Sequence, residues 1–242
     1  MYILKLAEKI SQRESRSMKI LDLGCGNGSV VFDLINSGLD AYGADIKFKQ
    51  GANVSMLENA GRIRKIKFAE VYQLPFDDGE FDLVFSEQVM EHVQDHHSVA
   101  SEIARVLKRD GVSIHRFPSR LRPIESHVFV PFSSVIRLYP WIIFWTALGF
   151  HKKKQKGMSI SKIASVNIDY LNSSTNYLNG RDLQEIFYQY FDKVYSAPRD
   201  YLDISPNFRG RLLGRISRIM PMLLVVYEMF GSRTLVLRLP KK

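Results

Sequence analysis

The sequence feature that most constrains the fold is a short apolar run that leads directly into closely spaced glycines. Residues 19–28 read Lys-Ile-Leu-Asp-Leu-Gly-Cys-Gly-Asn-Gly. The apolar residues predict a buried strand, and residues 29–36 predict a helix behind the glycines. Glycine is needed where a backbone turns sharply and must let a ligand come close. Free N–H groups at the start of the following helix make this turn a candidate site for the polar groups of a nucleotide-like ligand.

The glycine spacing departs from the dinucleotide-binding fingerprint. That fingerprint requires G-x-G-x-x-G, which Gly24 and Gly26 begin correctly. Its third glycine position is occupied by Ser29, and the additional glycine comes one residue early, at Gly28. The pattern Asp-x-Gly-x-Gly-x-Gly therefore favours a different class of nucleotide-like cofactor.

Predicted strands and helices alternate along most of the chain, which is typical of an α/β fold with a parallel sheet covered by helices on both faces. Asp45 ends the second predicted strand about twenty residues after the glycines, where an acid can accept hydrogen bonds from ribose hydroxyls. Strands are expected at 20–23, 41–46, 66–71, 81–86, 112–117, 193–197 and 234–239, and helices at 29–36, 47–60, 96–108 and 178–190.

Several sequence features, in a fixed order, carry a family resemblance over residues 18–118. After the glycine turn and Asp45 come Leu74-Pro75-Phe76, then Phe81-Asp82-Leu83-Val84, and finally Glu91-His92-Val93. In this combination the chain resembles the class I S-adenosylmethionine (SAM) methyltransferases. The resemblance implies SAM as the cofactor and a Rossmann-like, doubly wound sheet of seven strands, the last one antiparallel. We expect one domain over residues 1–242, with inserts at 119–177 and 199–232 that form a helical cap over the acceptor.

The resemblance also implies roles for individual residues. The glycine turn would cradle the methionine and ribose parts of SAM, the acid after the second strand would hold the ribose hydroxyls, and its neighbour would pack on adenine. Residues after the third strand would recognise the adenine amino group, and residues that end the fourth strand would close the methionine end. The cofactor-binding residues expected in this way are Asp22, Gly24, Cys25, Gly26, Asp45, Ile46, Glu70, Val71, Ser86 and Glu87.

The acceptor site is less defined by motifs. Ser86-Glu87-Gln88 is not the Asn/Asp-Pro-Pro-Tyr motif of many amino-group methylases, which favours an oxygen or carbon acceptor. A hydroxyl acceptor must lose a proton to a histidine or carboxylate. Just after the fifth strand, Pro-Ile-Glu-x-His resembles a segment of small-molecule and glycan-directed methyltransferases, so His127 is the candidate general base and Glu125 its orienting partner. The alternative is a packing or capping pair in a lid.

A histidine-rich stretch raises the question of a metal site. His92 and His96 are four residues apart, as two ligands on one helix face would be. No third ligand is evident nearby in the sequence, and the Glu-His-Val motif of the resembled family implies no metal. We therefore expect no metal.

Basic residues gather outside the cofactor motifs. The net charge of the chain is +9. Residues 119–177 and residues 199–242 each have a net charge of +6, and the rest of the chain has a net charge of −3. Apolar and aromatic residues flank these basic clusters at 135–150 and 212–230, a composition typical of segments that lie on a membrane surface. The alternative is a lid over the acceptor pocket. The single cysteine fits a reducing compartment, so we expect a cytoplasmic protein with peripheral contact to an anionic inner membrane face.

These patterns together predict a SAM-dependent methyltransferase. Its expected acceptor is a hydroxyl on an anionic or lipid-linked small molecule, such as a glycan intermediate. The charge keeps an RNA methyltransferase as the alternative enzyme, although no RNA-binding module is appended. The non-enzyme alternative is a SAM-binding protein that uses its cap for partner contacts. No sequence feature specifies an oligomeric state.

Overall fold

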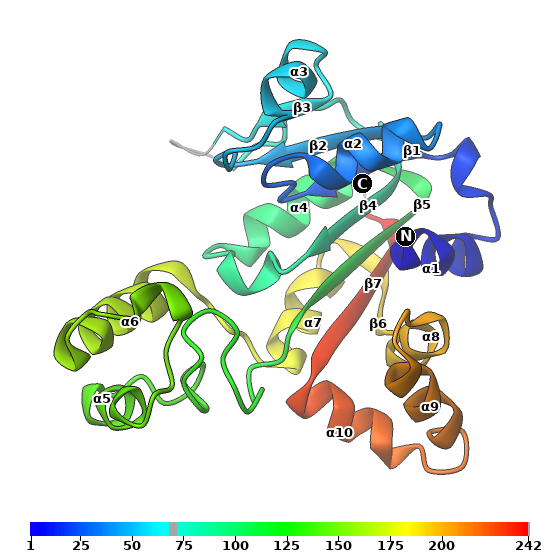
Figure 1. Cartoon of the computed structure of the whole chain (residues 1–242). Coiled ribbons are helices and arrows are strands. Elements are labelled where there is room, and N and C mark those ends of the chain that lie inside the picture. Colours follow the sequence, from blue (N-terminus) through cyan, green and yellow to red (C-terminus); the bar gives the residue numbers. More distant parts are fainter. Residues whose placement is uncertain (68–71, 242) are drawn as a thin grey trace.

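The computed structural model describes residues 1–67 and 72–241, and its centre is one mixed sheet of seven strands (Figure 1). The strand order is β3-β2-β1-β4-β5-β7-β6. Neighbouring strands from β3 to β5 are parallel, whereas β7 runs antiparallel to both β5 and β6. The seven-stranded sheet with an antiparallel last strand is therefore confirmed. The strands are β1 (Lys19–Leu23), β2 (Asp40–Asp45), β3 (Ile63–Lys65), β4 (Phe81–Glu87), β5 (Leu107–Pro118), β6 (Phe191–Ser196) and β7 (Ser232–Pro240).

The central strands are apolar on both faces because helices cover both. On β1, the side chains of Leu21 and Leu23 join one buried cluster, and Ile20 joins the other. Helices α4 (His96–Val106) and α7 (Gly180–Tyr188) supply the first cluster, and α1 (Tyr2–Ser11) and α2 (Ser29–Asn36) supply the second. Two buried faces explain why β1 and β4 read as continuous apolar runs and not as alternating ones.

Two predicted elements differ from the structure. The helix expected at 47–60 exists only as α3 (Val54–Asn59). The residues before it instead lie against the glycine turn, where the Lys49 N–H donates to the Gly26 carbonyl at 3.1 Å and Gly51 packs on Asn27. The third strand is β3, earlier than the expected 66–71, and residues 68–71 lie outside the described part of the chain.

The two inserts form separate helical groups (Figure 1). The first group contains α5 (Tyr139–Ala147) and α6 (Ile160–Ser174), which share a small core of their own built on Ile142, Ala164 and Leu171. The second contains α8 (Pro198–Ile204), α9 (Phe208–Ile216) and α10 (Met222–Phe230), and it packs on α1 and β7. Among the described residues, none of the helices is both long and apolar enough to cross a membrane.

The buried His115 on β5 links stability to pH. It is fully buried, with Nδ1 2.8 Å from the Ser86 hydroxyl and Nε2 2.7 Å from the Ser113 hydroxyl. Burial lowers its pKa to about 3. This environment keeps His115 neutral inside the sheet.

We expect the free energy of unfolding to fall as the pH is lowered from about 6.5 towards 3. In this range the unfolded chain binds a proton at His115 that the folded protein does not, at a cost of up to about 1.4 kcal/mol for each pH unit. Denaturant titrations at pH 7 and pH 5 measure the difference. The His115→Gln variant should show a shallower pH dependence, and an unchanged dependence would contradict the assignment.

Candidate active site

The glycine turn has the backbone geometry that its sequence predicts. Gly24, Gly26 and Gly28 have φ angles of +80°, +58° and +71°, a region that residues with a Cβ rarely adopt. Asp45 holds this turn in place, because its Oδ2 accepts the Gly26 N–H at 2.8 Å and its Oδ1 accepts the Lys47 N–H at 3.0 Å. The carboxylate at the end of β2 is therefore fixed beside the turn by two backbone donors.

A cavity of about 350 Å³ opens beside this turn, at the carboxyl ends of β1, β2 and β4. It has the features that a nucleoside cofactor requires. Asp45 offers acceptor oxygens for ribose hydroxyls, and the apolar side chain of Ile46 is 52% exposed next to it, as a residue that packs on adenine should be. Residues lining the cavity are Leu23, Gly24, Asp45, Ile46, Lys49, Ile66, Tyr72, Gln88, Val89, His92, Val93, Gln94, Asp95, Val99 and Tyr170.

Gly24 leaves room that any side chain would fill. A Cβ at this position would lie 2.3 Å from Val89 Cγ2, closer than atoms can approach. We expect Gly24→Ala to weaken SAM binding at least tenfold, since the turn must open or Val89 must move into the cavity. Calorimetric titration with SAM measures the loss.

Gly38→Ala is the matched control for that variant. Gly38 has nearly the same φ angle, +79°, but open space where the Cβ would be. It should share the backbone strain and keep the SAM affinity of the parent. Equal affinities for the Gly24 variant and the parent would contradict the placement of the cofactor.

The other predicted cofactor residues lie behind the cavity wall or outside it. Asp22 and Cys25 are buried beneath the turn, where burial raises the pKa of Asp22 to about 7. Ser86 is fully buried and bonded to His115. Glu87 accepts a hydrogen bond from Tyr2, and neither it nor Ser86 lines the cavity. The predictions for Glu70 and Val71 fall outside the described residues.

Several cavity residues were missed by the sequence interpretation. Gln88 and Val89, the two residues that directly follow Ser86 and Glu87 and the end of β4, line the cavity. Gln88 has a φ of +56°, so the chain turns here and carries these side chains to the cavity. Tyr170 comes from α6, far along the chain, and no motif indicates it.

Glu125 and His127 form a connected pair after β5, as the sequence predicts. The His127 Nδ1 lies 2.8 Å from Glu125 Oε1, and the backbone N–H groups of His127 and Val128 donate to Oε2 at 2.7 and 2.6 Å. The Tyr177 hydroxyl donates to Oε1 at 2.7 Å. Burial alone would raise the pKa of Glu125, but hydrogen bonds from His127 and Tyr177 outweigh it and hold the pKa below its usual value. Glu125 is therefore an ionised group that fixes the His127 ring.

His92 connects this pair to the cofactor cavity. It belongs to the 3-10 turn Met90–His92 and lines the cavity, and its Nε2 lies 3.1 Å from His127 Nε2. The alternative pairing of His92 with His96, considered from the sequence as a metal site, is not formed, because the His96 ring is buried with Nε2 3.1 Å from the Met90 carbonyl. The first insert thus brings His127 to a histidine of the α/β core.

Comparisons with known proteins agree with this architecture. Residues 21–115 match the family model described as a methyltransferase domain. The ubiquinone biosynthesis O-methyltransferase of Pelagibacter ubique is 22% identical over 192 residues, which cover 73% of this chain and 76% of that protein. A sterol 24-C-methyltransferase of Gibberella zeae is 33% identical over 99 residues, or 39% of this chain. The chain spans only about a quarter of that enzyme, since the match covers 26% of its length.

Solved structures show the same fold at low sequence identity. A phosphoethanolamine N-methyltransferase of Haemonchus contortus, solved with SAM, superposes with a TM-score of 0.53 at 14% identity over 99% of this chain and 52% of that one. A SAM-dependent methyltransferase of Mesorhizobium loti gives 0.51 at 13% identity, over 96% of this chain and 97% of that one. Residues 21–115 therefore carry a SAM-dependent methyltransferase domain, and the glycine turn and the cavity beside it fit SAM as its cofactor.

Proposed function

We propose that this enzyme methylates a hydroxyl oxygen on an anionic or lipid-linked small molecule. The observation that carries the proposal is the chain of contacts from Glu125 through His127 to His92, which reaches the wall of the cofactor cavity. Such an arrangement suits an acceptor that must lose a proton when it reacts. A sulfide or a neutral amine can attack the methyl group without first losing a proton, so its methylation would not require such a proton-accepting group.

The methyl transfer itself requires few catalytic groups from the protein. SAM supplies the methyl group on a sulfonium, and transfer forms an oxygen–carbon bond as the carbon–sulfur bond breaks and its electron pair goes to sulfur. The protein has to align the acceptor and promote loss of its proton. In the metal-free protein His127 would accept that proton at Nε2, with Glu125 as the positioning residue that keeps the other ring nitrogen protonated.

The relatives support a lipid-soluble acceptor class. Their names include ubiquinone biosynthesis, sterol and tocopherol methyltransferases, and two of these three kinds are O-methyltransferases. An acceptor of this kind would reach the cavity most readily from a membrane surface.

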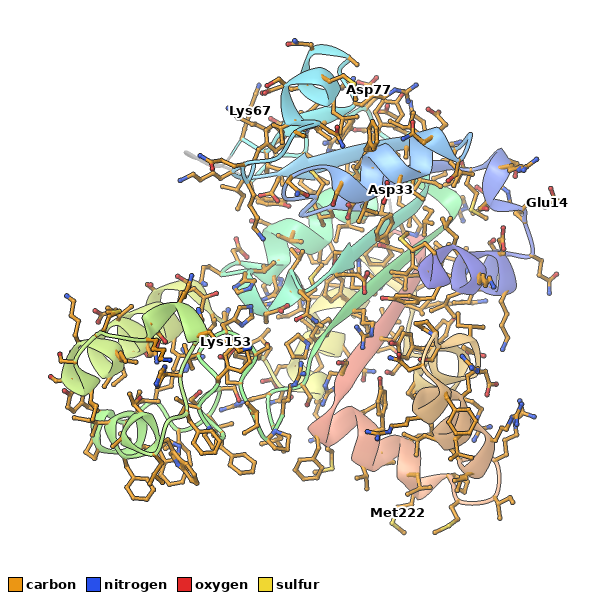
Figure 2. All side chains as sticks on the ribbon, in the orientation of Figure 1. Glu14, Asp33, Lys67, Asp77, Lys153 and Met222 are labelled. Atoms are coloured by element: carbon orange, nitrogen blue, oxygen red, sulfur yellow. The ribbon has the colours of Figure 1, made fainter. Side chains whose placement is uncertain are left out.

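The second insert offers a surface suited to such a membrane. We define the α9–α10 patch as the exposed apolar residues Phe208, Ile219, Met222 and Val225 with Arg209 and Arg215. Ile219 is 86% exposed and Met222 74%, and Met222 lies at the outer margin of its group, away from the sheet (Figure 2). Anionic lipid attracts each nearby basic residue by about 1 kcal/mol, and apolar side chains then insert among the headgroups. We propose that the protein docks peripherally on an anionic inner membrane face.

We expect the protein to sediment with vesicles of phosphatidylglycerol and phosphatidylcholine but not with phosphatidylcholine alone. Added salt should weaken the binding because it screens the arginines. Ile219→Glu with Met222→Glu should reduce the vesicle-bound fraction at least tenfold without unfolding, since both side chains are already exposed. Met56→Glu, 51% exposed on α3, is the matched control and should bind as the parent does. Equal binding by the double variant would contradict docking through this patch.

The acceptor class is tested with methyl-labelled SAM and fractionated cell extract. The proposal predicts label in the lipid fraction, or in small anionic glycan intermediates, in a bond stable to mild base as an ether is. Label in RNA would support the RNA methyltransferase instead, and steep salt dependence of RNA binding would accompany it. SAM binding without label in any fraction would favour a SAM-binding interaction protein.

A further inference from the structure

We propose that Glu91, His92 and His127 form a binding site for one divalent transition-metal cation of the zinc type. We call these residues the Glu–His–His cluster. One ligand atom from each lies within 4.8 Å of the others. Glu91 and His92 come from the core, and His127 from the first insert, so a bound cation would tie the insert to the core beside the cofactor cavity.

The two histidines present lone pairs to each other. His92 Nδ1 lies 2.7 Å from the Ser174 carbonyl, which can only accept, so Nδ1 carries the ring proton. His127 Nδ1 lies 2.8 Å from the Glu125 carboxylate and is protonated for the same reason. Both Nε2 atoms of the neutral rings are then acceptors, yet they face each other at 3.1 Å. A positive charge between them resolves the conflict, either a shared proton or a cation.

The spacing of these nitrogens suits a cation. Two ligands at about 2.1 Å from one zinc ion lie about 3.0 to 3.4 Å apart, depending on the coordination geometry. The observed 3.1 Å falls in this range, and the ring centroids are 4.6 Å apart with planes at 77°, so each ring can direct its lone pair to a common point.

Glu91 supplies the third ligand and the compensating charge. Its side chain is 2% exposed, and neither carboxylate oxygen has a hydrogen-bond partner among the described residues. A buried carboxylate without partners is costly, and the usual solutions are a hydrogen bond, an ion pair or a metal. Because no hydrogen bond holds these oxygens, a small side-chain rotation can bring one of them into the coordination shell.

The surrounding contacts match those of known metal sites. Metal-bound histidines usually donate their other ring N–H to a carboxylate or a backbone carbonyl, which sets the tautomer and the ring orientation. The Nδ1–H of His127 donates to the Glu125 carboxylate, and the Nδ1–H of His92 donates to the Ser174 carbonyl. Two imidazoles with one carboxylate favour a borderline cation such as zinc over magnesium, and three protein ligands leave a position open.

The open position gives the cluster a role that rests on the proposed function. A cation at this place would lower the pKa of a hydroxyl group that enters its open position, so that the proton leaves to solvent before the oxygen attacks the methyl group. His127 would then be a metal ligand, and the cation in place of the free imidazole would promote loss of the proton from the acceptor hydroxyl.

The test is metal binding to the whole protein, with any affinity tag removed and bound metal first stripped by a chelator. Titration with Co²⁺ should give visible ligand-field bands that saturate at one equivalent, and Zn²⁺ should displace them. Glu91→Gln and His127→Gln should each weaken Co²⁺ binding at least tenfold. His97→Gln, an exposed histidine of α4 outside the cluster, should bind as the parent does.

The possible outcomes separate this proposal from the proposed function. Bands that do not saturate at one equivalent, or that persist in the Glu91 and His127 variants, would overturn the site. If Co²⁺ and Zn²⁺ do not bind but methyl transfer still depends on His127, the metal site is wrong and His127 is the base. One bound equivalent in a protein that transfers no methyl group would leave the site standing and overturn the proposed function.

Discussion

Replacing His127 with alanine is expected to lower turnover at least a hundredfold while the affinity for SAM stays unchanged. Loss of a group that promotes proton removal commonly costs about 10²- to 10⁴-fold in rate. His127 touches His92 at the cavity wall but does not itself line the cavity, so cofactor binding should not depend on it. Steady-state rates with the acceptor found by label transfer, together with calorimetry of SAM, measure the two quantities separately.

Two further variants separate the role of His127 from a structural one. Glu125→Gln should lower kcat more than it raises KM for the acceptor, because an amide leaves the His127 ring without its ionised partner. His97→Ala should keep parental rates, since its ring lies outside the cluster. Equal turnover in the His127 variant and the parent would remove this residue from the chemistry.

The second large effect is expected from Asp45→Ala, which should weaken SAM binding more than tenfold. The substitution removes the acceptor for two ribose hydroxyls and also the bond that holds the Gly26 N–H at 2.8 Å. The glycine turn would lose its anchor at the end of β2. Calorimetry measures the affinity, and thermal unfolding checks that the sheet remains intact.

Asp33→Ala is the control for that variant. Asp33 is an exposed carboxylate on the neighbouring helix α2 and does not line the cavity (Figure 2). Removing its charge leaves the cofactor contacts in place, so its affinity should equal that of the parent. An Asp45 variant that binds SAM like the parent, or a parent that prefers NAD, would exclude the assigned pocket.

The sheet could be predicted from the sequence because its strands and turns are indicated by short runs of neighbouring residues. In the run Ile20-Leu21-Asp22-Leu23, Ile20 packs into one cluster and Leu21 and Leu23 into the other, and a strand buried on two faces needs a parallel sheet with helices on each side. The positions of the glycine turn after β1 and of Asp45 at the end of β2 were also predicted correctly, since their spacing follows from one strand–helix–strand unit. Where local signals conflict the prediction was poorer, as at residues 47–53, which pack on the turn and do not form a helix.

The acceptor side of the site could be predicted only in part. Glu125 and His127 are adjacent in sequence, and their pairing was expected. Their meeting with His92 depends on how the first insert folds on the core, which no spacing along the chain reveals. The metal alternative considered from sequence paired His92 with His96 on one helix, whereas the structure pairs His92 with a residue from another segment.

A crystal structure of the protein with S-adenosylhomocysteine tests the central claim most directly. It should show the ribose hydroxyls within hydrogen-bond distance of the Asp45 carboxylate, the adenine against Ile46, and the homocysteine sulfur directed towards His92 and Tyr170. A ligand bound elsewhere, or a pocket beside Gly24 that stays empty at saturating ligand, would contradict the account.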